Sequence, residues 1–285
     1  LIAETLHEEI VRVEPLAQLI EDKTAGNPFF VIQFLQALAE AQLLTFDHGA
    51  RRWCWDPNRI HAMGYTDNVV DLMVAKLARL PAETQRALQH LACLGNVAAI
   101  ATLSLALGLS KSQLRAVMWE AIRLELVERL DGAFGFVHDR IHEAAYSLIP
   151  VELRPHTHLR IGRLLAAQTP VSVLDEAIFD IVGQLNQGAA LLTDTSEKEQ
   201  LAEFNLIAGQ RAKASSAYAS ALNYLTTGVQ LLDDECWVRR HTLRFEMELN
   251  RAECEFLTGQ LAVADTRLTT LSAHATTTVE RANVA

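Results

Sequence analysis

The spacing of apolar residues predicts helices over residues 1 to 45. The clearest of them begins at Asn27-Pro28, because an Asn side chain can cap free backbone N–H groups and Pro suits the first helical position. Apolar residues then recur at the i, i+4, i+7 and i+8 spacing of one buried helical face. The residues of this face are Phe30, Phe34, Ala37 and Leu38.

Two stretches change to the alternating pattern of short strands. Residues 43 to 55 predict a hairpin with its turn at 47–49, and residues 126 to 137 predict a second hairpin around Asp131-Gly132. Three helices directly before the second hairpin give the order of a winged-helix-like domain. The helices predicted between the hairpins cover residues 67–79, 81–95, 98–107 and 110–125.

After Pro150 the pattern is helical to the end of the sequence, with similar residues 43 positions apart. Small residues recur where paired helices must approach closely, which is typical of tetratricopeptide-like (TPR-like) repeats joined by a long loop around 233–235. The fold class predicted is therefore mainly α, with domains at 1–66, 67–150 and 151–285. The pairs at this offset are Leu206 with Leu249, Ala221 with Ala264 and Leu225 with Leu268.

Charge and cysteine content narrow the function classes. With 25 basic and 35 acidic residues the net charge is −10, which repels phosphate backbones and argues against direct nucleic-acid binding. The four cysteines lack metal-type pairing and indicate reduced thiols in a cytoplasmic protein. Glycines interrupt the most apolar stretch, residues 91–109, so no membrane span is expected.

The sequence offers little catalytic chemistry of its own. A phosphate-binding loop needs Gly directly before its Lys, and none of the five lysines has one, so we expect no ATP hydrolysis by this chain. His138 and His142 stand four residues apart with an acid between them, a spacing that can hold zinc on a helix. That acid, Asp139, is shorter than the Glu of the zinc-protease pattern, and no third ligand is evident, so a bound metal is not expected.

Four short segments together resemble one known family. They are similar, in their order over nearly the whole chain, to the STAND class of signal-transduction ATPases. The most similar members are the large predicted ATPases fused to Ser/Thr kinase, GAF and histidine-kinase domains in bacteria. The segments that carry the resemblance are 26–30 (Gly-Asn-Pro-Phe-Phe), 64–73, 136–140 (Phe-Val-His-Asp-Arg) and 184–190.

The resemblance implies roles for two residues. Residues 1–66 would belong to a helical lid beside the ATPase core, with Pro28 packing against adenine. His138 would touch the β-phosphate of ADP and hold the closed state, although Val137 stands where the family motif has Met. ATP or ADP would then bind to the parent protein, whose phosphate loop we expect upstream in the same polypeptide, and this chain would hold no cofactor alone.

The function implied is that of a non-catalytic regulatory and protein-interaction fragment. It would couple the nucleotide state of the ATPase core to a protein partner that binds the helical repeats. An alternative is the corresponding region of a large ATP-dependent transcriptional regulator, whose DNA-binding domain would lie outside this sequence. A zinc-dependent hydrolase built on His138 and His142 is the weaker alternative.

Overall fold

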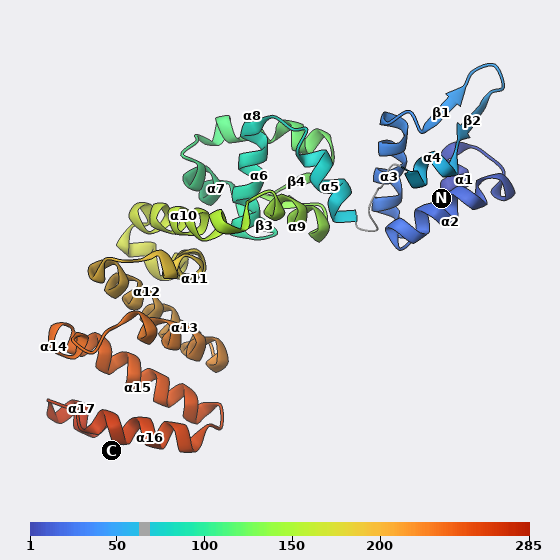
Figure 1. Cartoon of the computed structure of the whole chain (residues 1–285). Coiled ribbons are helices and arrows are strands. Elements are labelled where there is room, and N and C mark those ends of the chain that lie inside the picture. The colour runs from blue at the N-terminus through green and yellow to red at the C-terminus, as the bar shows by residue number, and fades with distance from the viewer. Residues whose placement is uncertain (63–68) are drawn as a thin grey trace. The chain divides into compact units, whose positions relative to one another are not determined.

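The computed structural model is mainly helical with two small antiparallel sheets, as the sequence predicts (Figure 1). It describes residues 1–62 and 69–285, so the predicted helix start at 67–68 lies outside the described residues. Each of the two compact units combines separate stretches of chain. Unit 1 is Leu1–Ala98 with Gln113–Ile149, and unit 2 is Ala99–Ser112 with Pro150–Ala285.

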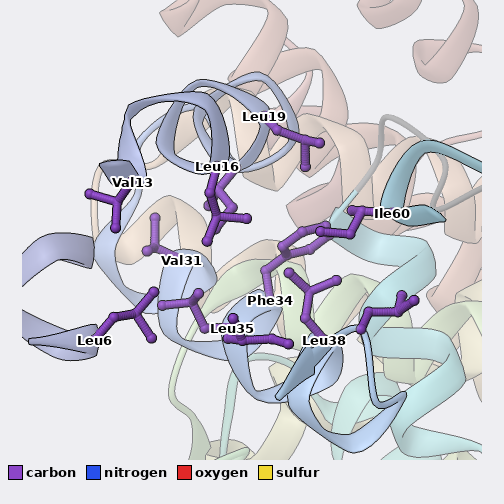
Figure 2. Close-up of a cluster of buried hydrophobic side chains, with 12 residues drawn as sticks. Leu6, Val13, Leu16, Leu19, Val31, Phe34, Leu35, Leu38 and Ile60 are labelled. Carbon is purple, nitrogen blue, oxygen red and sulfur yellow. The ribbon is translucent and has the colours of Figure 1, made fainter. Parts of the chain in front are cut away.

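The first helices of unit 1 bury one shared apolar cluster. The side chains of Leu16, Phe34 and Leu38 lie at its centre, almost completely removed from water (Figure 2). Removing such side chains from water is the main driving force for packing these helices together. The helices are α1 (Ile2–Leu6), α2 (Ile10–Thr24) and α3 (Pro28–Glu40).

The predicted first hairpin is confirmed and is followed by α4 (Pro57–Ala62). Strands β1 (Leu44–Asp47) and β2 (Arg52–Trp55) pair antiparallel. The carboxylate Oδ1 of Asp47 accepts hydrogen bonds from the backbone N–H groups of Gly49 (2.8 Å) and Ala50 (3.0 Å). The Asp47 side chain therefore closes the turn, which explains why residues 47–49 predict a turn from the sequence alone.

Residues 69–147 follow the predicted order of helices and second hairpin, with one strand added, although the predicted helix at 98–107, observed as α7 (Ile100–Leu107), belongs to unit 2. Strand β3 was not predicted, and it joins the hairpin in a sheet of order β3-β5-β4. The backbone N–H of Phe136 donates to the carbonyl oxygen of Asn96 at 2.9 Å beside this strand. The winged-helix assignment stays a prediction. The elements are α5 (Val69–Leu77), α6 (Ala82–Leu94), β3 (Val97–Ala99), α8 (Lys111–Arg123), β4 (Val127–Leu130), β5 (Ala133–Phe136) and α9 (Asp139–Ser147).

Unit 2 stacks its long helices one on the next, in the order α10, α11, α12, α13, α15 and α16 (Figure 1). In the described parts of the chain, no helix combines the length and apolar character needed to cross a membrane. The helices of this unit are α7 (Ile100–Leu107), α10 (Arg154–Gln168), α11 (Leu174–Gln187), α12 (Thr195–Ala214), α13 (Tyr218–Leu231), α14 (Cys236–Arg239), α15 (His241–Leu257), α16 (Leu261–Ser272) and α17 (Thr278–Asn283).

The 43-residue offset corresponds to two helix pairs at equivalent positions. Ala221 is the fourth residue of α13 and Ala264 the fourth residue of α16, and both are buried. The pair α12–α13 therefore matches the pair α15–α16. The short helix α14 follows the predicted loop at 233–235. The assignment of these pairs to TPR-like repeats, like the predicted domain boundaries, stays a prediction.

Candidate functional site

Two helix N-termini from distant parts of unit 1 meet at Asn27 and His138. Asn27 caps α3, because its Oδ1 accepts a hydrogen bond from the backbone N–H of Phe29 at 3.0 Å. His138 caps α9, because its Nδ1 accepts from the backbone N–H of Arg140 at 3.1 Å. The remaining side-chain nitrogens, Asn27 Nδ2 and His138 Nε2, lie 3.4 Å apart. The two caps therefore face each other directly.

Two phenylalanines hold the His138 ring in place. Phe29 stacks on the imidazole with ring centroids 5.9 Å apart and planes 11° apart. Phe30 approaches it edge-on at 4.6 Å and 63°, and its own side chain is buried. Aromatic pairs at these distances add stabilisation beyond the surface that they bury. The imidazole position is therefore set by the start of α3.

The hydrogen-bond roles leave both facing nitrogens as donors. Since Nδ1 of His138 accepts a backbone N–H, the proton of the neutral ring lies on Nε2. Since the oxygen of Asn27 accepts from Phe29, its NH2 group points to His138. Two donors cannot satisfy each other, but an oxygen atom that accepts from both would satisfy them.

Helix electrostatics favour a negatively charged acceptor at this place. The N-terminal end of an α-helix carries a partial positive charge and attracts anions. Helix α3 has 13 residues and α9 has nine, so both are long enough for this effect. The converging donors and helix ends can therefore bind an anionic oxygen, such as that of a phosphate group.

Pro28 and His138, the two residues singled out from sequence, lie close together in the structure. Pro28 is the first residue of α3 and is exposed, next to the capping Asn27. The contribution of Asn27 and the two phenylalanines was missed from sequence, although all three belong to the segment that carries the resemblance. What could not be recognised there was that this segment contacts His138, 111 positions away from Asn27.

Helix α3 makes further contacts with the region after the first hairpin, at the middle and at the C-terminal end of the helix. The ammonium group of Lys76 donates to the side-chain oxygen of Gln33, and Arg79 pairs with Glu40 at 3.4 Å. Burial lowers the pKa of Lys76. A groove of about 290 Å³ runs between α3 and α5 at these contacts. The start, middle and end of α3 therefore each contact the region after residue 69.

His142, the second histidine of the spacing that can hold zinc on a helix, has a different partner. Nε2 of His142 lies 3.0 Å from the carbonyl oxygen of Ala92 on α6, and its ring packs edge-on against Phe136. No group of three His, Cys, Asp or Glu side chains suited to a metal ion occurs among residues 1–62 and 69–285. His138 therefore contacts the start of α3, whereas His142 contacts α6.

The comparisons with known proteins point to signalling. No protein-family model matches the chain, and no solved structure matches it. The chain is similar to the hybrid signal transduction histidine kinase G of Dictyostelium discoideum, with 28% identity over 327 aligned residues. The match covers 93% of this chain but 10% of that kinase. The similarity supports a signalling context.

Proposed function

We propose that this chain is a regulatory and protein-interaction part of a STAND-type signal-transduction ATPase. It senses the nucleotide held by the ATPase core of the same polypeptide and transmits that state to a protein partner bound at the helical repeats. The chain itself carries out no catalysis, and ATP or ADP is bound by the parent protein in the cytoplasm. Its similarity to a hybrid histidine kinase is consistent with a signalling role of this kind.

The observation that carries the proposal is the pair of donors at Asn27 and His138. Asn27 through Nδ2 and His138 through Nε2 would both donate to a phosphate oxygen of ADP bound beside the two nitrogens, at the N-termini of α3 and α9. Such an oxygen ties α3 to the start of α9. Loss of the nucleotide removes that tie and leaves two donors facing each other, which favours separation of the two helix ends.

The test is ADP binding by the full-length polypeptide that contains the phosphate-binding loop. We expect His138→Ala to weaken ADP affinity about tenfold, roughly the worth of one charge-assisted hydrogen bond. Asn27→Asp is expected to weaken it at least as much, because a carboxylate still caps α3 but repels phosphate. Isothermal titration calorimetry measures both affinities.

The matched control is His156→Ala, which removes an exposed histidine of α10 in the other unit. Its ADP affinity should equal that of the unmodified protein. Unchanged affinity in both the His138 and Asn27 variants contradicts nucleotide sensing at this site. A full-length protein that binds no nucleotide contradicts the proposed function as a whole.

A further inference from the structure

The last helices of unit 2 line an open pocket of about 570 Å³, a volume within the usual range for ligand sites. It lies between α14, α15 and α16, away from the Asn27–His138 site in sequence. Charged, aromatic and small apolar side chains all contribute to its walls. The lining residues used below are Trp237, Arg244, Glu248, Val263, Arg267 and His274.

Positive charge exceeds negative charge beside this pocket. Arg267 pairs with Glu248 at 2.6 Å and with Glu255 at 2.8 Å, and Arg244 pairs with Glu248 at 3.1 Å. Arg251 makes only longer contacts with the same two carboxylates, at 3.9 and 3.6 Å. Three guanidinium groups thus share two carboxylates, which leaves an excess of one positive charge.

Within the described residues, two of these guanidinium groups also have a buried Nε–H that makes no hydrogen bond, although Arg251 Nε lies 3.6 Å from a Glu255 oxygen. The two groups are those of Arg244 and Arg251. Burial and the neighbouring Arg267 lower the pKa of Arg251, as expected for a cation that lacks a full counter-charge. Buried unsatisfied donors are rare in folded proteins. The cluster beside the pocket is therefore short of both hydrogen-bond acceptors and negative charge.

The same pocket has an apolar and aromatic wall. Trp237 stacks on His274 with centroids 4.1 Å apart, and the Arg244 guanidinium lies 5.7 Å from the Trp237 ring. Val263 lines the pocket and is 46% exposed. Leu261 and Phe256, at the turn between α15 and α16, are exposed as well. Apolar and aromatic side chains therefore line the same pocket as the guanidinium group of Arg244.

We propose that this pocket binds an acidic peptide segment of a protein partner. One carboxylate of the segment meets the guanidinium of Arg244, and a neighbouring apolar side chain packs on Trp237 and Val263. The excess positive charge of the guanidinium cluster favours an acidic residue in the peptide. The apolar wall next to it favours an apolar neighbour of that residue. This inference rests on the proposed role of the helical repeats as the partner-binding region and names the chemistry of that partner.

The test uses two end-blocked, fluorescently labelled hexapeptides, one of alternating leucine and aspartate and one of alternating leucine and asparagine. Fluorescence anisotropy measures their binding to the full chain. We expect the aspartate peptide to bind at least tenfold more tightly than its asparagine counterpart. The difference should shrink as salt is raised from about 0.05 to 0.5 M, because salt screens the charge attraction.

Val263→Glu is the decisive variant, because it places a negative charge on the pocket wall at a position that tolerates a polar side chain. Binding of the aspartate peptide should fall at least tenfold. Val238→Glu is the matched control, since Val238 is 89% exposed on α14 and does not line the pocket. That variant should bind the peptide within twofold of the unmodified chain, and both variants should keep its circular dichroism spectrum.

Three results overturn the inference. In the first, the two peptides bind equally or not at all. In the second, the Val263→Glu variant binds the aspartate peptide as tightly as the unmodified chain does. In the third, a second copy of the chain covers the pocket. In the last case sedimentation shows self-association that Val263→Glu abolishes and the aspartate peptide does not disrupt. If any of these occurs while Asn27→Asp still weakens ADP binding, this inference fails and the proposed function stands.

Discussion

Replacing Arg267 by alanine is expected to destabilise the α15–α16 pair by about 3 kcal/mol, the usual cost of removing one partner from a buried ion pair. Its guanidinium group hydrogen-bonds both Glu248 and Glu255, and the Glu255 side chain is only 4% exposed. Without Arg267, Arg244 and Arg251 remain near these carboxylates, but the short contacts to Glu255 are lost. Hydrogen exchange followed by mass spectrometry should show backbone amides of α15 and α16 exchanging about a hundredfold faster.

Two further variants separate charge from packing and from general surface effects. Arg267→Met keeps the apolar stem and should destabilise the pair as strongly as alanine if the charge matters. Arg163→Ala removes a half-exposed partner of Glu197 in the same unit and should change exchange in α15 and α16 less than twofold. Exchange at the unmodified rate in Arg267→Met would show that stem packing, not ion pairing, holds these helices together.

The features that the sequence predicted well are those fixed by neighbours along the chain. The Asn27 cap and the Asp47 turn each depend on hydrogen bonds to backbone groups two or three residues away. Such contacts form whenever the local backbone adopts its preferred shape. For the same reason the two hairpins and the start of α3 were found within a residue or two of their positions in the structure.

Strand β3 and the charge cluster around Arg267 could not be predicted from local sequence patterns. Strand β3 has three residues, two of them alanine, within an apolar run, so its pairing with β5 is decided by the sheet rather than by its own sequence. Glu248 and Glu255 each follow an arginine by four residues on α15, a spacing visible in the sequence. Their bonds to Arg267, on another helix, were not predictable from that spacing.

The candidate site was only partly predictable for the same physical reason. Its components were available from the resemblance, which named Pro28 and His138. The facing donors arise because Asn27 and His138 each use one side-chain atom to cap their own helix, which leaves a nitrogen for the other. That arrangement depends on the packing of α3 against the start of α9, and no local pattern encodes packing across 111 positions.

The second large effect is expected from Gly188→Ala at the end of α11. A methyl group added at Gly188 would lie 2.7 Å from the backbone carbonyl oxygen of Pro155 and 2.6 Å from the Cβ of Leu159. Neither atom is the tip of a flexible side chain, so α10 and the end of α11 must move apart. Overpacking of this kind costs about 2 kcal/mol. The thermal midpoint of unit 2 should fall by about 4–8 °C.

Gly183→Ala on the same helix is the matched control and should have the opposite sign. Gly183 is exposed inside α11, and an added methyl group would meet no atom within 4 Å. Alanine stabilises a helix interior relative to glycine by about 0.5–1 kcal/mol, because it restricts the unfolded chain. Differential scanning calorimetry should therefore place the midpoint of Gly183→Ala above that of the unmodified chain and that of Gly188→Ala below it. If both substitutions shift the midpoint in the same direction, the close approach of α10 to Gly188 does not limit the stability of unit 2.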